Sequence, residues 1–213
     1  MRLFDYRASG NCYKIRLALA QLALPYERVP VDIFAGETLT DEFEQLNPVR
    51  TTPVLVPDDG PPLPESGAIL IHLAEGTPLL PDDPADRAQV YRWLFFEQSA
   101  LMPTIAGLRF RLITGRLTRG SSGARARHHT GEQLLGLLGD HLAEREFLVE
   151  TGYSVADIAV YAYVHVGGDA GLTIPDAVQA WIARVEAQPG FMNDLEPYPV
   201  NAQAGASVSI YDA

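Results

Sequence analysis

A short proline-rich segment divides the 213-residue chain into two parts with different hydrophobic patterns. This segment covers residues 76–84, reads Gly-Thr-Pro-Leu-Leu-Pro-Asp-Asp-Pro, and has no periodic pattern. Before it, short alternating runs predict strands between helices, whereas after it apolar residues recur at helical spacing. We therefore expect a mixed α/β domain over residues 1–76, a linker over 77–84 and an all-helical domain over 85–213.

The first part predicts the element order βαβαββα, in which helices cover both faces of a mixed sheet. A turn at Asp58-Asp59-Gly60 joins two short runs, which is typical of a hairpin, and the prolines around it favour a short edge strand. The strand-like runs are residues 2–6, 26–33, 52–57 and 61–64, and the helical runs are 11–23, 40–46 and 65–75.

The second part predicts helices joined by short loops. Its first helical stretch runs from residue 84 to about 115, and Pro103 inside it predicts a kink because proline removes a hydrogen bond and clashes with the preceding turn. A Gly/Ser-rich loop follows, and the chain ends in an aperiodic segment for which we expect an extended tail. The further helices are expected over 124–142, 154–166 and 175–188, and the tail over 194–213.

Composition excludes several classes of protein. With 47% apolar and 20% charged residues, the chain is neither disordered nor collagen-like nor a coiled coil. A net charge of −11 argues against a nucleic-acid partner, and no apolar run approaches the roughly 18 residues of a membrane span. The single cysteine, Cys12, excludes an internal disulfide framework and a multi-cysteine zinc site. Residues 1–6 match neither a signal nor a transit peptide, so we expect a cytoplasmic protein.

The turn before the first helix reads Ser9-Gly10-Asn11-Cys12. A helix N-terminus offers unpaired N–H groups and a partial positive charge, which favour an anion such as a thiolate. The Ser9 hydroxyl could donate a further hydrogen bond to that anion. The spacing is that of a thioredoxin-like Cys-x-x-Cys motif in which a hydroxyl replaces the first thiol. Taken alone, the segment favours a plain turn or capping role for Ser9.

Two further pairs of neighbouring residues lie at the start of a predicted strand or helix and are candidates for binding a ligand. The bond between Thr52 and Pro53 is a candidate for a cis peptide that turns the Thr52 backbone outward, although most such bonds are trans. Glu65 and Ser66 open a helix, where the Ser66 hydroxyl and free N–H groups could hold a carboxylate and Glu65 could accept from an ammonium group. Taken alone, this pair favours simple helix capping.

In this order, on a βαβαββα unit followed by helices, these segments resemble the glutathione transferase superfamily over nearly the whole chain. The resemblance implies a thioredoxin-like N-terminal domain with a mixed four-stranded sheet, followed by an all-α domain. It also implies that Ser154 and Asp157 form a capping box, in which Asp157 is structural. The segments that carry it are residues 9–19, 47–55, 65–70, 154–159 and 181–191.

The resemblance implies a detoxifying transferase with glutathione as co-substrate. Ser9 falls at the position of the catalytic serine in theta- and zeta-like classes or a related bacterial class. A free cysteine thiol has a pKa of about 8.5, and the Ser9 hydroxyl would lower the pKa of the glutathione thiol by stabilising its thiolate. The thiolate would attack a small hydrophobic or anionic electrophile. We expect no metal, because no ligand spacing supports His128 and His129.

The expected glutathione-binding residues follow from the same resemblance. Thr52, before Pro53, would pair its backbone with the cysteinyl part of glutathione. Glu65 and Ser66 match the pair that binds the γ-glutamyl part. Asn11 is either a second donor to the thiolate or a loop-capping residue.

Three functions remain open at this point. The first is a conjugating transferase that works as a homodimer. The second is a glutathione-dependent peroxidase or disulfide reductase, against which the absence of a thiol at position 9 counts. The third is a non-catalytic binding protein of the same fold.

The electrophile would lie between the two domains. We expect about two of six apolar side chains to contact it, since few residues line a typical pocket. The basic stretch Arg109–Arg127 holds six arginines and no acidic residue, which favours a solvated basic face or a subunit contact, with anionic ligands as the alternative. The six candidate wall residues are Tyr91, Trp93, Phe95, Phe96, Met102 and Phe110.

Overall fold

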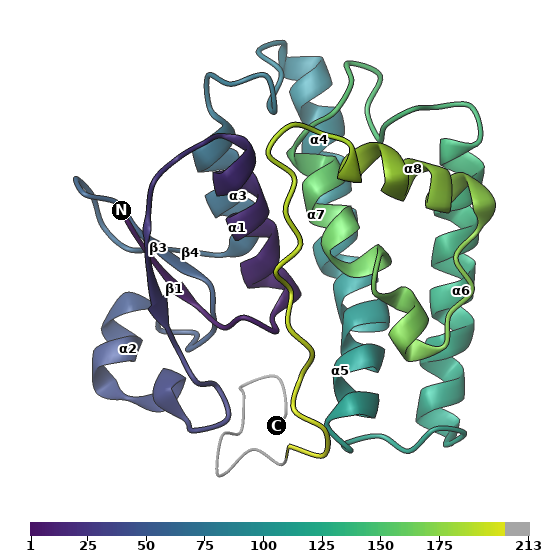
Figure 1. Cartoon of the computed structure of the whole chain (residues 1–213), viewed down its shortest axis with the longest axis horizontal. Helices are drawn as coiled ribbons and strands as arrows, with labels where there is room; N and C mark the ends of the chain where they lie inside the picture. Colours follow the sequence, from purple (N-terminus) through teal and green to yellow (C-terminus); the bar gives the residue numbers. More distant parts are fainter. Residues whose placement is uncertain (203–213) are drawn as a thin grey trace.

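The computed structural model describes residues 1–202, and it confirms the order βαβαββα for the first part (Figure 1). The proline-rich segment separates this part from the helices that follow. The elements are β1 (Arg2–Asp5), α1 (Gly10–Gln21), β2 (Glu27–Pro30), a 3₁₀ turn η1 (Glu37–Leu39), α2 (Asp41–Leu46), β3 (Val54–Val56), β4 (Leu63–Pro64) and α3 (Ser66–Ala74).

The four strands form one mixed sheet in the order β2-β1-β3-β4. β1 pairs with β2 in parallel, and the crossover that this requires is α1. β3 pairs antiparallel with both β1 and β4, as expected for the predicted hairpin. α1 and α3 lie between the sheet and the helical part of the molecule, while α2 lies on the other side of the sheet (Figure 1). The start of α1 therefore faces the helical part.

The second part is helical throughout its regular elements, as the sequence predicts. Its first helix begins with Asp83 as the N-cap and Pro84 in the first turn, a position that suits proline. The helical path continues through Pro103, where the hydrogen bonding becomes π-helical; a wider helix relieves the clash of a proline ring with the preceding turn. The elements are α4 (Pro84–Phe96), the π-helical η2 (Glu97–Ala106), α5 (Gly107–Ile113), α6 (Ser122–Leu142), α7 (Val155–Val164), η3 (Gly167–Ala170) and α8 (Asp176–Glu186).

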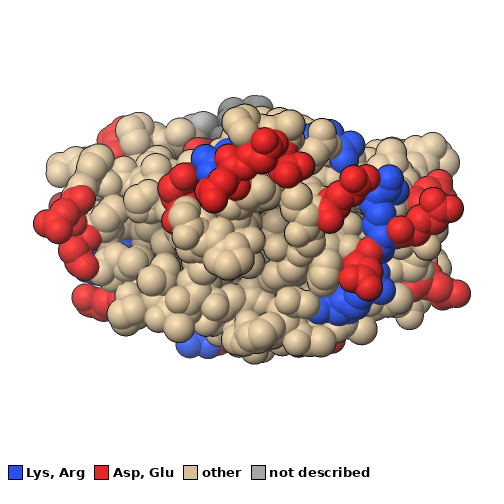
Figure 2. Space-filling model, turned by 90° about the horizontal axis from the view of Figure 1, so that it is seen from above, with Lys and Arg blue, Asp and Glu red and all other residues tan. Residues whose placement is uncertain are grey.

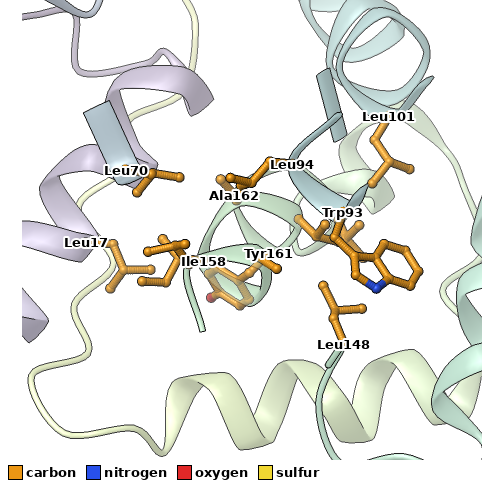
Figure 3. Close-up of a cluster of buried hydrophobic side chains, with 14 of the residues drawn as sticks. Leu17, Leu70, Trp93, Leu94, Leu101, Leu148, Ile158, Tyr161 and Ala162 are labelled. Atoms are coloured by element: carbon orange, nitrogen blue, oxygen red, sulfur yellow. The ribbon is translucent and has the colours of Figure 1, made fainter. Parts of the chain in front are cut away.

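One buried apolar cluster extends through both parts of the molecule. α7 is buried along its whole length and packs against α1. Figure 3 shows Leu17 of α1 and Leu70 of α3 on one side of Ile158, with Leu94 of α4 beyond. Because apolar burial contributes about 25 cal/mol per Å², this shared core holds α1 firmly against the helices.

The capping box at the start of α7 is present as the sequence predicts. The Asp157 carboxylate accepts from the backbone N–H of Ser154 at 3.0 Å and of Leu148 at 3.0 Å, and from the Trp181 indole N–H at 2.9 Å. Burial raises the pKa of Asp157 to about 6, against these hydrogen bonds, which lower it. Asp157 therefore links the start of α7 to Leu148 in the preceding loop and to Trp181 of α8.

The C-terminal segment (residues 191–202) crosses the molecule between its two parts, drawn in yellow in Figure 1. Through residue 202 it has no helix or strand. The carbonyl of Met192 accepts from the Tyr13 hydroxyl at 2.9 Å, and Asp194 pairs with the buried Arg16 at 2.9 Å. The rest of the predicted tail, residues 203–213, lies outside the described residues.

Acidic side chains dominate the charged surface, consistent with the net charge of −11. On the face shown in Figure 2, Asp and Glu form several clusters, whereas Lys and Arg gather in fewer places. Within residues 1–202, each helix is too short or too polar to cross a membrane.

Candidate functional site

A cavity of about 570 Å³ opens between the two parts of the molecule, beside the first turn of α1. The first part supplies most of its polar lining, and both parts supply apolar and aromatic side chains. The polar residues of the first part are Ser9, Asn11, Thr38, Glu44, Arg50, Thr51 and Thr52, and the main side chains of the helical part are Met102, Phe110, Arg111, Arg116, Tyr163 and Tyr198.

Ser9 stands at the N-terminus of α1 and also lines this cavity. Its Oγ accepts from the backbone N–H of Cys12 at 3.4 Å, and its own N–H donates to the carbonyl of Tyr6 at 3.0 Å. Because Oγ acts as an acceptor in the cap, the hydroxyl hydrogen is left to donate to a ligand. The capping role is thus confirmed, and it is compatible with the predicted contact to a thiolate.

Cys12 lies one turn into α1 and is fully buried. Its Sγ accepts from the N–H of Tyr6 at 3.4 Å. Burial, and then the nearby Asp5 carboxylate, raise the pKa of Cys12 to about 11. At neutral pH this thiol is protonated and unreactive, so a thiol that works in this cavity has to come from a ligand.

Thr52 also lines the cavity, and the Thr52–Pro53 peptide bond is cis. The side chain of Pro53 is buried behind it. The general preference of such bonds for trans made this geometry the less expected one, whereas the family resemblance pointed to it.

Glu65 and Ser66 stand beside the cavity but are not among the residues that line it. Glu65 has a φ of 68°, a conformation that costs a non-glycine residue about 1–3 kcal/mol and that is concentrated at functional sites. Ser66 is buried, and its hydroxyl donates to the side-chain oxygen of Asn11 at 3.0 Å. Asn11 therefore connects the start of α3 to the start of α1.

Gln98 of η2 completes this polar cluster from the helical part. Its side-chain amide nitrogen donates to Asn11 at 3.1 Å and to the Ser66 hydroxyl at 3.1 Å. Sequence reasoning missed Gln98, and no local pattern marks it. The contact joins residues 87 positions apart in the chain.

The residue before Gln98 makes a second link between η2 and α1. Glu97 accepts from the Lys14 ammonium group at 2.9 Å, and both side chains are fully buried. Burial raises the pKa of Glu97, and the charge of Lys14 opposes this effect. A buried ion pair loses much of its energy to desolvation, so its main consequence here is to fix how η2 sits against α1.

Solved structures share both the fold and much of the sequence. A glutathione S-transferase from Pseudomonas fluorescens is 40% identical, with a TM-score of 0.88, over 92% of this chain and 98% of that one. Residues 3–81 match the family description "Glutathione S-transferase, N-terminal domain". This chain belongs to the glutathione S-transferase family.

Other members of the family show how its functions vary. The disulfide-bond oxidoreductase YfcG of Escherichia coli is 31% identical over 193 residues, which cover 86% of this chain and 89% of that protein. Protein URE2 of Eremothecium gossypii is 39% identical over 119 residues, which cover 51% of this chain and 34% of that protein. This chain thus spans about a third of the length of the yeast relatives.

The six predicted wall residues divide between the cavity and other parts of the molecule. Two of the six, Met102 and Phe110, line the cavity. Trp93 lies in the core, and Phe95 is 71% exposed on α4. That Met102 and Phe110 contact an electrophile stays a prediction.

Three aromatic residues of the cavity were missed by sequence reasoning: Phe34, Tyr163 and Tyr198. Tyr163 of α7 packs so closely on Gly10 that a Cβ atom on Gly10 would lie 2.3 Å from its ring. Any side chain at position 10 would collide with Tyr163, so this position requires glycine. Only the tertiary contact between α1 and α7 reveals this requirement.

The basic stretch Arg109–Arg127 does not form a single face. Arg109 is buried and pairs with Asp169 at 2.8 Å, whereas Arg111 and Arg116 line the cavity. Most other arginines of the stretch donate to backbone carbonyls. Over residues 1–202, no group of three His, Cys, Asp or Glu side chains is arranged to hold a metal.

Proposed function

We propose that this protein is a glutathione S-transferase in which Ser9 stabilises the thiolate of bound glutathione. The observation that carries the proposal is the position of Ser9, which caps α1 through an acceptor bond and lines the cavity, where its hydroxyl could donate to a bound thiolate. The partial positive charge of the helix N-terminus adds to this stabilisation. Ser9 acts as a hydrogen-bond donor and neither as a nucleophile nor as a base.

The reaction then has two steps. The glutathione thiol releases its proton to solvent as the thiolate forms beside Ser9. The thiolate sulfur forms a bond to the electrophilic carbon, and the leaving group departs with the electron pair of its own bond. The apolar lining from the helical part holds the electrophile and excludes water from it.

The polar lining suggests how glutathione is oriented. The backbone of Thr52 pairs with the cysteinyl part, while Glu65 and Ser66 take the charged γ-glutamyl end. Gln98 positions Ser66 and Asn11 by its two hydrogen bonds. Arg50 is the one cation that the first part contributes to the cavity, and we assign the glycyl carboxylate to it.

Solved relatives support glutathione as the ligand. Ure2p has been solved in complex with glutathione and is 25% identical to this chain, with a TM-score of 0.78. A glutathione transferase from Pseudomonas putida, solved with one glutathione disulfide bound per subunit, is 29% identical, with a TM-score of 0.79.

Glutathione-dependent disulfide reduction is the second candidate, favoured by the similarity to the disulfide-bond oxidoreductase YfcG. The same thiolate would attack one sulfur of a disulfide, and the other sulfur would leave as a thiolate. Cys12 takes no part because its thiol is buried and protonated. Parallel assays with a chlorodinitrobenzene and with a small dialkyl disulfide separate the two activities, and binding without either turnover would indicate a binding protein.

Calorimetric titration with glutathione tests the proposal. We expect the wild type to bind, and Glu65→Gln to weaken binding about 10-fold, because a hydrogen bond to a charged group is worth about 1.5–3 kcal/mol. Glu42→Gln is the matched control, since Glu42 is an exposed carboxylate of α2 outside the cavity. A wild type that does not bind glutathione contradicts the proposal, and an unchanged affinity in Glu65→Gln removes Glu65 from the site.

We also propose a homodimer in which α4 contacts a second copy of the chain. Phe95 of α4 is 71% exposed, and large exposed side chains of this kind often mark an interface. We expect Phe95→Glu to raise the dissociation constant of the dimer at least 10-fold. Light scattering coupled to size exclusion over a range of concentrations measures this change. Leu137→Glu is the control, because Leu137 is 52% exposed on α6. A monomeric wild type, or equal effects of both variants, would show that α4 is not the interface.

A further inference from the structure

One wall of the cavity consists of aromatic rings that come from separate segments of both parts of the molecule. Phe110 of α5 stacks on Phe34, with ring centroids 6.3 Å apart and 23° between the ring planes. Tyr198 of the C-terminal segment meets Phe110 edge-on at 5.0 Å. All three residues line the cavity, so a flat aromatic ligand finds ring faces and edges to pack against.

Two arginines stand in the same wall. The guanidinium of Arg116 lies 4.8 Å from the centroid of Phe110 and donates to the carbonyl of Ala202 at 3.0 Å. Arg111 reaches the carbonyl of Gly107 at 3.4 Å. Neither arginine forms an ion pair within residues 1–202, and both keep N–H donors for a ligand.

The charges that line the cavity do not balance. Arg50 pairs with Glu44 at 2.7 Å, so these two largely cancel. Among the residues that the structure describes, Arg111 and Arg116 have no acidic partner, in a protein whose net charge is −11. The surrounding surface repels anions, whereas this wall attracts them, and a site for neutral apolar ligands needs no such arginines.

We propose that the helical side of the cavity selects flat aromatic electrophiles that carry an anionic group, such as a ring carboxylate. The ring packs on Phe110 and Tyr198, and the carboxylate accepts from Arg111 and Arg116. This inference rests on the proposed glutathione conjugation, because the same cavity holds the thiolate. In the conjugation of a chloroarene carboxylate, the sulfur–carbon bond forms, the carbon–chlorine bond breaks, and chloride leaves with the electron pair while the carboxylate stays bound.

The test compares a chlorodinitrobenzoate with the corresponding chlorodinitrobenzamide, which has the same shape without the charge. We expect the wild type to show a kcat/KM at least about 10-fold higher for the benzoate, as two charge-assisted hydrogen bonds allow. Arg111→Gln combined with Arg116→Gln should bring the ratio to about one, mainly through a loss of kcat/KM for the benzoate. Arg119→Gln combined with Arg125→Gln changes the net charge equally outside the cavity and should keep the preference.

A binding measurement separates this inference from the proposed function. Dinitrobenzoate and dinitrobenzamide, which lack the leaving group, are titrated into the protein without glutathione. Tighter binding of the benzoate that requires Arg111 and Arg116 supports the inference even if glutathione fails to bind, which would overturn the proposed function alone. Equal affinities for the two compounds overturn the inference even if glutathione binds. If circular dichroism shows that the double variant does not fold, the same comparison of benzoate and benzamide is made with Arg111→Gln and Arg116→Gln separately.

Discussion

Replacing Ser9 with alanine should lower kcat/KM for glutathione conjugation about 100-fold, near the lower end of what removal of one anion-stabilising donor costs in enzymes. The helix N-terminus would still favour the thiolate in this variant, so some activation remains. The pKa of the bound thiol should rise toward its value in free cysteine, about 8.5, and the rate profile should shift to higher pH. The measurements are kcat/KM as a function of pH and the ultraviolet absorbance of the bound thiolate.

Ser9→Thr separates the chemistry from the capping role. Threonine keeps both the hydroxyl donor and the cap to the Cys12 N–H, so its pH profile should stay near that of the wild type. Ser9→Ala also loses the cap, which costs about 1 kcal/mol of stability, and the assays should therefore run well below its melting temperature. A Ser9→Ala enzyme with the wild-type pH profile would exclude the thiolate role of Ser9.

Replacing Asp157 with alanine should lower the free energy of unfolding by about 4 kcal/mol, the largest stability effect expected for this chain. The carboxylate accepts from Ser154, Leu148 and Trp181, and all three donors lie in the interior. Each buried donor left without an acceptor costs about 1–3 kcal/mol. Urea denaturation at a pH above 7 measures the loss with the Asp157 carboxylate ionised, since its pKa is about 6.

Asp176→Ala is the matched control for this measurement. Asp176 lies in the first turn of α8 and is exposed, so its removal should cost less than about 0.5 kcal/mol. Asp157→Ala should also leave the affinity for glutathione of the remaining folded protein unchanged, because Asp157 lies outside the cavity. A loss of stability no larger than that of Asp176→Ala would show that the capping box does not join the helical core as inferred.

The sequence alone predicted those parts of the site that depend on neighbouring residues. Ser9 precedes a helical run, and a hydroxyl in that position caps the helix whatever the rest of the fold does. The hairpin of β3 and β4, and the pairing of Ser154 with Asp157, follow equally from residues a few positions apart. Such preferences act within a single turn or strand, so a pattern in the chain is enough to indicate them.

Gln98 and Tyr198 show what the sequence alone could not predict. Gln98 matters because the path of η2 brings it to Asn11 and Ser66, and Tyr198 matters because the C-terminal segment runs back between the two parts. The basic stretch divides in the same way, since Arg109 is buried against Asp169 while Arg111 and Arg116 reach the cavity.

The amino-acid sequence by itself determined the order of helices and strands, the caps and the hydroxyl at the start of α1, because hydrophobic period and capping chemistry are local. Only the tertiary structure decided which aromatic side chains form the wall of the cavity and which arginines line it. The physical reason is that Phe34, Phe110 and Tyr198 come from three separate segments, and no local preference encodes the meeting of residues so far apart in the chain.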